Sequence, residues 1–219
     1  MNKRPLLLGH RGASRYAPEN SIAAFDLALQ HGCDGFEFDV RYTLDGRSVI
    51  CHDLHHEHQR IDACLSDELS LPSAEDVVRN YATRAYLDVE LKVTGDASAV
   101  FDALQTVPCD RYVISSFLPE VLKRVNAGWQ GVPLGLICET SSQLQHSPML
   151  PIQAVMIESK LASKSLIAEL HAGGRKVFVW TVNKEREMRS FADLGVDGLI
   201  SDDTRLLART FGRNDSPLV

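Results

Sequence analysis

The 219-residue sequence has no excess of positive charge. Its 23 Lys and Arg residues are outnumbered by 29 Asp and Glu residues, which gives a formal net charge of -6. Proteins that bind nucleic acids or anionic membranes usually display a basic patch or stripe, and no Lys/Arg run here exceeds a few residues. The sequence therefore argues against a nucleic-acid partner. An acidic protein that handles an anionic substrate needs local cations or a metal ion, so individual Arg and Lys residues gain importance.

Long hydrophobic runs and paired cysteines are also missing. The apolar run at 6–8 ends at Gly9, too early for a signal peptide, and no stretch is long enough to span a membrane. The five cysteines are odd in number and form no C-x-x-C pair, as expected of free thiols in a reducing compartment. We therefore expect a cytoplasmic protein.

The sequence contains no Pro/Ser linker, low-complexity segment or sudden change in composition. Hydrophobic residues make up 44% and charged residues 24%, a balance typical of a globular protein with a sizeable core. A length of 219 residues is near the lower end for one eight-fold barrel and long for two independent cores. We expect a single domain over 1–219, with 212–219 as a flexible tail.

Short apolar runs alternate with amphipathic stretches along the chain, a pattern typical of repeated β-α units. Eight strands are predicted at 5–9, 34–42, 86–93, 111–115, 133–138, 153–158, 175–182 and 197–201. Helices are predicted at 21–31, from 73 onward, and at 97–105, 119–126, 163–172, 184–194 and 203–211. The helix after the fifth strand is poorly defined. We expect a short locally paired strand near 47–51, and N-caps at Asn20 and Asn183.

Two predicted strands carry charge on one face only. Glu37 and Asp39 alternate with apolar residues in one strand, and Asp88, Glu90 and Lys92 do so in the next. Alternating β and α elements allow either a closed (β/α)8 barrel or an open doubly wound sheet. Charges pointing into a protein interior are costly unless they bind a metal or pair closely. The carboxyl ends of barrel strands face a shared pocket, so the pattern favours the barrel.

The carboxylates of these strands predict a metal site. Glu37, Asp39 and Glu90 offer three hard oxygen ligands from neighbouring strands, which suits Mg²⁺ or Ca²⁺ better than zinc. A lone E-x-D would more simply be a surface or salt-bridged pair. Two charged strand faces opposed by apolar faces favour the metal, and we expect one divalent cation.

Two histidines at loop positions are candidates for proton transfer. His10 follows the first strand, and Arg11 beside it can grip a phosphate in a bidentate way, while Gly12 lets the backbone turn closely past a ligand. His52 ends the short apolar run 48–51 and can return to the same pocket. Two histidines on opposite sides of a phosphodiester can act as general base and general acid. Taken alone, either motif could also be an ordinary loop or turn.

Three further features have two readings each. Lys92 can neutralise charge on a phosphate in the transition state or pair with Glu90, and both can hold. Trp180 can form an apolar wall for a glycerol or choline-like group or belong to the core. The histidines at 55, 56 and 58 match no standard metal site, and we expect a solvated loop, with the pocket rim as a possible location.

Taken in order, the motifs resemble the glycerophosphodiester phosphodiesterase family, nearly end to end. They are G-H-R-G-A at 9–13, P-E-N-S at 18–21, D-G-F-E-F-D-V at 34–40, D-G at 45–46, H-D at 52–53, E-L-K at 90–92, S-S-F at 115–117, V-W-T-V-N at 179–183 and G-V-D-G-L-I-S-D at 195–202. The resemblance implies a TIM-type barrel that hydrolyses glycerophosphodiesters to an alcohol and glycerol 3-phosphate.

The resemblance also implies roles for nine residues. These are His10 and His52 as the acid-base pair, Glu37, Asp39 and Glu90 as metal ligands, Arg11 and Lys92 as phosphate binders, and Phe117 and Trp180 as residues bordering the substrate. The order of action of the two histidines stays open, as does attack by water or by a glycerol hydroxyl through a cyclic phosphate.

One departure from the family concerns substrate choice. Many members carry a longer capping insertion after H-D, whereas this chain has 33 residues between Asp53 and Leu87. A reduced cap leaves a more open pocket, so lysophospholipids join glycerophosphodiesters as possible small-molecule substrates. A lysophospholipase D-like hydrolase, a catalytically silent phosphodiester-binding barrel, and a barrel acting on a cyclic or inositol phosphodiester are the alternatives. The oligomeric state is not predicted.

Overall fold

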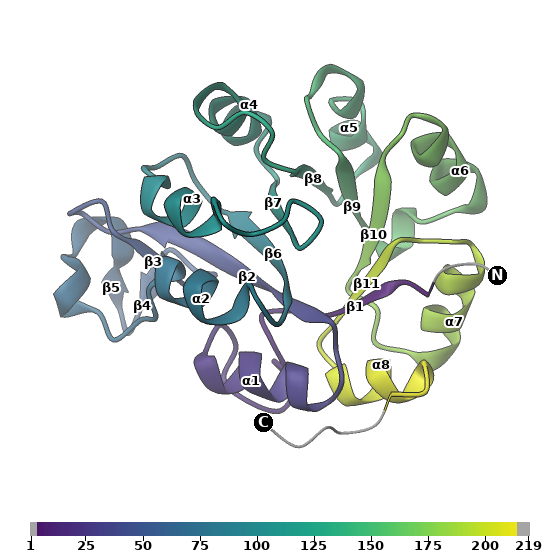
Figure 1. Ribbon diagram of the computed structural model, residues 1–219, viewed down its shortest axis with the longest axis horizontal. Helices are drawn as coiled ribbons and strands as arrows, with labels where there is room; N and C mark the ends of the chain where they lie inside the picture. Colours follow the sequence, from purple (N-terminus) through teal and green to yellow (C-terminus); the bar gives the residue numbers. More distant parts are fainter. Residues whose placement is uncertain (1–3, 214–219) are drawn as a thin grey trace.

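The computed structural model describes residues 4–213, and eight parallel strands form its centre (Figure 1). They are β1 (Leu6–Gly9), β2 (Gly35–Tyr42), β6 (Tyr86–Leu91), β7 (Tyr112–Ser116), β8 (Leu134–Cys138), β9 (Ala154–Glu158), β10 (Lys176–Trp180) and β11 (Gly198–Ser201). Neighbours in this order pair in parallel, and β1 pairs with both β2 and β11. The sheet therefore closes on itself, which confirms the predicted barrel.

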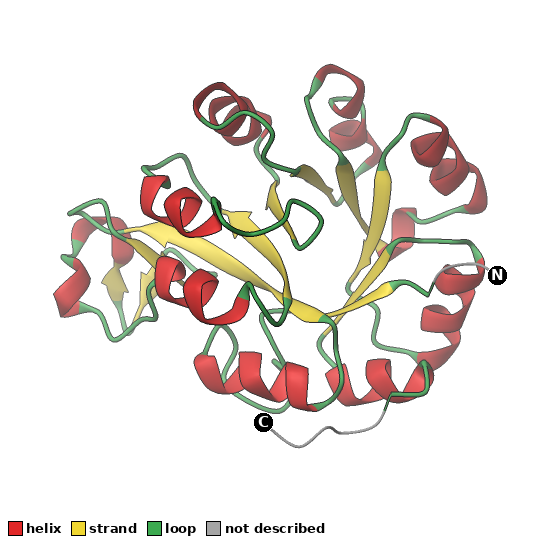
Figure 2. Cartoon of the chain, in the orientation of Figure 1, coloured by secondary structure: helices red, strands yellow, loops and turns green. Residues whose placement is uncertain are grey.

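Helices surround the barrel on its outside (Figure 2). They are α1 (Ile22–Gln30), α2 (Ala74–Tyr81), α3 (Ser98–Leu104), α4 (Pro119–Gly128), α5 (Ser141–Leu144), α6 (Lys164–Ala172), α7 (Glu185–Asp193) and α8 (Thr204–Thr210). The poorly defined element after the fifth barrel strand is α5, a single turn capped by Thr140 and followed by the 3-10 turn Ser147–Met149. The predicted helix start at 73 is confirmed, since Ser73 Oγ accepts a hydrogen bond from the Asp76 amide at 3.4 Å.

The segment between β2 and α2 lies beside the barrel. Strand β3 (Ser48–Ile50) pairs antiparallel with β2, which confirms the predicted local strand. The hairpin of β4 (His55–His56) and β5 (Gln59–Arg60) and two 3-10 turns, Ile61–Ala63 and Ser66–Glu68, follow. The expectation of a solvated loop around the three histidines was right about solvent, since His55 and His58 are exposed, but wrong about the loop, because His55 and His56 form β4.

Side chains alternate between two cores. One apolar cluster fills the barrel interior and is made of Leu8, Tyr86, Val113, Ile137, Ala154, Met156, Phe178 and Ile200. The larger cluster lies between the sheet and the helices. There Phe36 of β2 stacks on Phe25 of α1 with ring centroids 4.3 Å apart, and burial of each phenylalanine stabilises the fold by about 2 kcal/mol. Since Phe36 and Phe38 face the helices, the intervening Glu37 and Asp39 face the barrel interior.

The end of the chain is described only as far as Arg213. Its amide donates to the Ala208 carbonyl at 2.9 Å, and its guanidinium donates to Asp34 at 3.1 Å. The rest of the predicted tail, 214–219, lies outside the described residues.

Candidate active site

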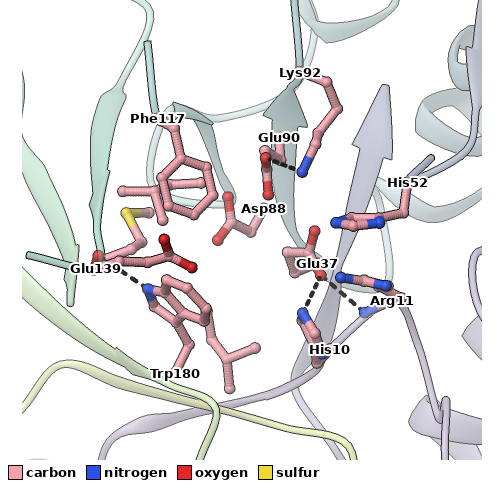
Figure 3. Close-up of a pocket in the computed structure, with 13 residues that line it drawn as sticks. His10, Arg11, Glu37, His52, Asp88, Glu90, Lys92, Phe117, Glu139 and Trp180 are labelled. Atoms are coloured by element: carbon pink, nitrogen blue, oxygen red, sulfur yellow. Dashed lines mark hydrogen bonds and ion pairs between the residues drawn. The ribbon is translucent and has the colours of Figure 1, made fainter. Parts of the chain in front are cut away.

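A cavity of about 150 Å³ opens at the carboxyl ends of the barrel strands (Figure 3). It is lined by His10, Arg11, Glu37, His52, Asp88, Glu90, Lys92, Phe117, Ile137, Glu139, Met156, Trp180 and Ile200. Of the nine residues predicted for the site, all but Asp39 line this cavity. Asp39 lies directly behind it, in contact with Arg11 and Lys92. None of the histidines at 55, 56 and 58 is a lining residue, so their expected place at the rim was wrong.

The loop after β1 has the close turn expected from its glycine. Arg11 and Gly12 both adopt left-handed backbone conformations, with φ angles of 53° and 78°. A Cβ atom at Gly12 would lie 2.7 Å from a backbone atom of Ala24, so only glycine fits there. The left-handed conformation costs a non-glycine residue about 1 kcal/mol. It allows the Arg11 amide to donate a 2.8 Å hydrogen bond to Glu37 Oε2.

Glu37, Asp39 and Glu90 form a buried carboxylate cluster. Ligand atoms from the three side chains lie within 4.8 Å of one another. Burial and the neighbouring charges of Asp39 and Glu90 raise the pKa of Glu37 well above its ordinary value. Burial and Asp39 likewise raise the pKa of Glu90 to about 7. Glu37 and Glu90 resist ionisation and lie beside Asp39. A bound cation would stabilise the ionised form of all three carboxylates.

Asp39 keeps its charge because cations and an amide surround it. Burial alone would raise its pKa, but Lys92, the Asn20 hydrogen bond and Arg11 together lower it. Lys92 Nζ lies 3.2 Å from Asp39 Oδ1, and Asn20 Nδ2 donates to Oδ2 at 2.8 Å. The predicted N-cap at Asn20 was wrong. Ser21 caps α1 instead, and Asn20 uses its side chain to hold Asp39.

The cluster fits a hard divalent cation. Glu37 Oε1 is buried and has no hydrogen-bond partner within the described chain. The three carboxylates face two cations, Lys92, whose Nζ lies 2.6 Å from Glu90 Oε1, and Arg11, whose Nε lies 3.4 Å from Asp39 Oδ2. An orphaned carboxylate oxygen in such a cluster is costly, and coordination of Mg²⁺ or Ca²⁺ would satisfy it.

His10 belongs to a hydrogen-bonded chain that reaches the last strand. Its Nδ1 lies 2.7 Å from Asp202 Oδ1, and its Nε2 points into the cavity, 4.0 Å from Glu37 Oε2. Asn183 Nδ2 donates to the other oxygen of Asp202 at 2.6 Å, and Ser14 Oγ donates to Oδ1 at 3.3 Å. Burial would raise the pKa of Asp202, but the hydrogen bond and charge of His10 outweigh it, so the pKa is lowered. A carboxylate there favours the tautomer with Nδ1 protonated, which leaves Nε2 as the proton acceptor.

The predicted cap at Asn183 was also wrong. Helix α7 begins after Lys184 without a side-chain cap, and Asn183 Oδ1 instead accepts hydrogen bonds from Ser201 Oγ and the Asp202 amide. Asp202 received no role from the sequence. Its position just beyond a barrel strand, where catalytic groups gather, was the available signal.

His52 has a more exposed setting. It follows β3, and its Nδ1 lies 2.8 Å from Asp53 Oδ1, a carboxylate whose side chain is 78% exposed. Arg41 Nε donates to the His52 carbonyl at 2.8 Å and thereby holds its backbone. Figure 3 shows His52 above Arg11 and His10, on the side of the cavity that also holds Glu37.

The opposite wall of the cavity is aromatic. Phe117, just after β7, and Trp180, at the end of β10, meet edge to face with ring centroids 5.7 Å apart. Trp180 Nε1 donates to the Met156 carbonyl at 3.1 Å, which fixes the plane of the indole. Both readings of Trp180 describe its position, since the ring lines the cavity and also packs against the apolar cluster of the barrel interior.

Comparison with known proteins shows the family. The pattern of the glycerophosphoryl diester phosphodiesterase family matches residues 10–77 and 82–206. The chain belongs to this family. A glycerophosphodiester phosphodiesterase of Caldanaerobacter subterraneus is 28% identical over 93% of this chain and 96% of its own, and one of Bacillus altitudinis is 26% identical over 90% and 94%. The predicted family and the enzyme class, a phosphoric diester hydrolase, are thereby confirmed.

Solved structures of similar fold support the barrel of this glycerophosphoryl diester phosphodiesterase family member. A phosphodiesterase of Oleispira antarctica, solved in complex with the product sn-glycerol-3-phosphate, superposes with a TM-score of 0.84 at 24% identity, covering 95% of this chain and 97% of that one. A glycerophosphodiester phosphodiesterase of Thermotoga maritima gives 0.81 at 21% identity, covering 95% and 99%. Among residues 4–213, no helix is both long and apolar enough to cross a bilayer.

Two acidic residues of the cavity were missed from the sequence. Asp88, two residues before Glu90 on β6, accepts a 2.6 Å hydrogen bond from Ser115 Oγ, and burial raises its pKa to about 7. Asp88 had been assigned to the charged face of its strand, but without a function. Glu139 follows β8 and extends into the cavity beside the aromatic wall (Figure 3). As for Asp202, its position just beyond a predicted barrel strand was the available signal.

Proposed function

We propose that the protein hydrolyses glycerophosphodiesters to an alcohol and glycerol 3-phosphate. The observation that carries the proposal is the meeting of two histidines and a three-carboxylate cluster at one cavity, at the catalytic end of a barrel. Membership of the family supports it. So does the glycerol 3-phosphate product seen in the Oleispira antarctica structure.

Glu37, Asp39 and Glu90 would hold one divalent cation, Mg²⁺ or Ca²⁺. When bound, such an ion polarises phosphoryl oxygens and orients the nucleophile. The carboxylates themselves must be ionised to bind it, so the cluster releases the protons that its raised pKa values retain.

His10 and His52 would act as the acid-base pair. One imidazole removes the proton of the attacking hydroxyl, and the other gives a proton to the departing alcohol oxygen. Nε2 of His10 is available for this role, because its Nδ1 is engaged by Asp202. The same division of labour serves attack by water or by the neighbouring glycerol hydroxyl.

Arg11 and Lys92 would bind the phosphate. Burial lowers the pKa of each side chain, but nearby carboxylates outweigh it and raise both, so both remain cationic at neutral pH. Fixed cations that already face the cavity stabilise the extra negative charge of the transition state without reorganisation. Phe117 and Trp180 would border the organic part of the substrate and exclude water from one side.

Parallel hydrolysis assays test the proposal. Glycerophosphocholine and lysophosphatidylcholine are incubated with Mg²⁺, with Ca²⁺ and with a chelator, and the release of glycerol 3-phosphate and choline is measured. Metal-dependent release of glycerol 3-phosphate from glycerophosphocholine is the expected result. Preference for the lysophospholipid would replace the proposal with the lysophospholipase D reading, and turnover of neither would contradict it.

The same assays should include Glu37→Gln and Glu75→Gln. Glu37→Gln should abolish metal-dependent turnover without unfolding the protein, whereas Glu75, on helix α2 away from the cavity, should tolerate the change. Full activity of Glu37→Gln would overturn the metal site.

We also infer a single domain and a cytoplasmic location, the latter supported by five cysteines that are all free thiols.

A further inference from the structure

The cavity has two unlike halves. On the side of β1, β2 and β6 lie the histidines, the carboxylate cluster and its cations, Arg11 and Lys92. On the side of β7, β8 and β10 lie Phe117, Glu139 and Trp180. The first half accounts for the reaction at phosphorus. The second half contains an acidic side chain that this reaction does not use.

Glu139 is an available carboxylate. Its amide donates to Gln143 Oε1 at 2.8 Å, which ties its backbone to the start of α5. Its side chain lines the cavity, is exposed to solvent, and has no hydrogen bond or ion pair with any residue in the described range 4–213. The acid one strand further on, Glu158, is different, because it pairs with Lys160 and does not line the cavity.

The two aromatic rings beside Glu139 form a corner with exposed faces. Phe117 and Trp180 are nearly perpendicular, at an interplanar angle of 88°. Because the indole N–H is already used on the Met156 carbonyl, Trp180 offers its ring and no hydrogen-bond donor to a ligand. The Phe117 ring already attracts one cation, since Lys92 Nζ lies 5.7 Å from its centroid. Aromatic faces next to an unpaired carboxylate are the chemistry that recognises alkylated ammonium groups.

We propose that Glu139, Phe117 and Trp180 form a subsite for the ammonium group of the departing alcohol. The protein then prefers glycerophosphodiesters of choline or ethanolamine to those of uncharged alcohols. The inference rests on the proposed function, and it adds a substrate class to it. A zwitterionic substrate matches the polarity of the cavity, with its phosphate toward Arg11 and Lys92 and its ammonium toward the opposite wall.

Selectivity measurements test the subsite. We would determine kcat/KM for glycerophosphocholine and for glycerophosphoglycerol, whose departing alcohol is neutral, with the wild type, Glu139→Gln and Glu158→Gln. The wild type should prefer the choline substrate, and Glu139→Gln should lower the ratio of the two kcat/KM values about tenfold. Glu158→Gln, which removes a similar charge outside the cavity, should leave the ratio as in the wild type.

The outcomes separate the subsite from the reaction. An unchanged ratio in Glu139→Gln, or the same fall in Glu158→Gln, would overturn the subsite while the phosphodiesterase activity stands. Absence of turnover in the wild type would contradict the proposed function instead. In that event calorimetric binding of glycerophosphocholine to the wild type and to Glu139→Gln decides the subsite, since weaker binding by the variant supports it and equal binding overturns it.

Discussion

The two histidines of the active site are held in different ways. His10 stands at the end of a barrel strand, and its carboxylate partner Asp202 is itself held by Asn183 and Ser14. His52 stands beyond β3, outside the ring of parallel strands, and its partner Asp53 is exposed. A partly buried network of several hydrogen bonds fixes orientation better than a single pair with a partner that is 78% exposed.

This difference predicts that the protein orients His10 more tightly than His52. The barrel fixes His10 against the carboxylate cluster, 4.0 Å from Glu37. The segment that carries His52 continues into the β4–β5 hairpin, which lies beside the barrel. Orientation by the protein should therefore matter more at His10 than at His52, even if both transfer protons.

The largest reduction in kcat is expected from removal of either imidazole. His10→Ala and His52→Ala should each reduce kcat about a hundredfold or more, because a general acid or base contributes about that much. Measured kcat for glycerophosphocholine hydrolysis checks this, with calorimetric metal binding as the measure of an intact site. His171→Ala is the matched control, since His171 pairs with Asp197, away from the cavity, and should retain full turnover. Full turnover in both test variants would remove the acid-base proposal.

Replacing the orienting carboxylates should give unequal effects. Asp202→Asn should reduce kcat by about tenfold to a hundredfold, because an amide no longer favours the correct tautomer or stabilises the charged imidazole. Asp53→Asn should reduce it by less than about threefold, since an exposed partner is readily replaced by water. The pH profile of kcat should shift for Asp202→Asn, as the low pKa of Asp202 shows that it carries charge beside His10. Equal losses of kcat in the two variants would contradict the inference that the protein orients His10 more tightly than His52.

Metal affinity of the carboxylate cluster should depend on pH. Burial raises the pKa of Glu90 from 4.5 to about 7, so below pH 7 a cation must displace a bound proton. The dissociation constant for Mg²⁺ or Ca²⁺ should therefore rise about tenfold per pH unit below 7 for each proton displaced. Titration calorimetry at pH 6, 7 and 8 measures this, and a pH-independent constant would contradict it.

The same carboxyl group links stability to pH in the metal-free protein. Between about pH 4.5 and 7 the folded state retains a proton that the unfolded chain has released. The free energy of unfolding should therefore fall as the pH rises through this window, and added cation should restore it. Denaturant unfolding with chelator at several pH values checks the sign.

The smallest effect is expected at the edge of the network. Ser14 Oγ donates to Asp202 at 3.3 Å, a longer contact than the 2.6 Å bond from Asn183. Ser14→Ala should therefore change kcat by less than about twofold. The reduction in kcat caused by Asn183→Ala should be larger than that of Ser14→Ala and smaller than that of Asp202→Asn. A larger loss in Ser14→Ala than in Asn183→Ala would reverse the assigned order of support for His10.

The barrel and the main site residues were predictable because their signals are local. Alternation of charged and apolar side chains placed Glu37, Asp39 and Glu90 on one face, and strand ends placed His10 there too. Helix α5 was the weakest element in the sequence, and in the structure it is a single turn. Local patterns carry little information about an element of four residues.

The two asparagines show where local reasoning failed. Asn20 and Asn183 both precede helices, and asparagine is a favoured N-cap residue. Each instead bonds an aspartate that is distant in sequence, by 19 residues in both cases, at the centre of the site. The competing partner comes from tertiary structure, so no window around either asparagine reveals it. Glu139 does follow a predicted strand, but its neighbours in space come from other strands, so its place beside the aromatic rings was not predicted.

Closure of the barrel makes the first strand depend on the last. His10 follows β1, its partner Asp202 follows β11, and the two strands pair side by side although 192 residues separate the two side chains. A growing chain thus contains both histidines and all three carboxylates long before it contains Asp202. During synthesis, which adds residues one at a time from the N-terminus, a fully oriented His10 is gained only when the final strand emerges.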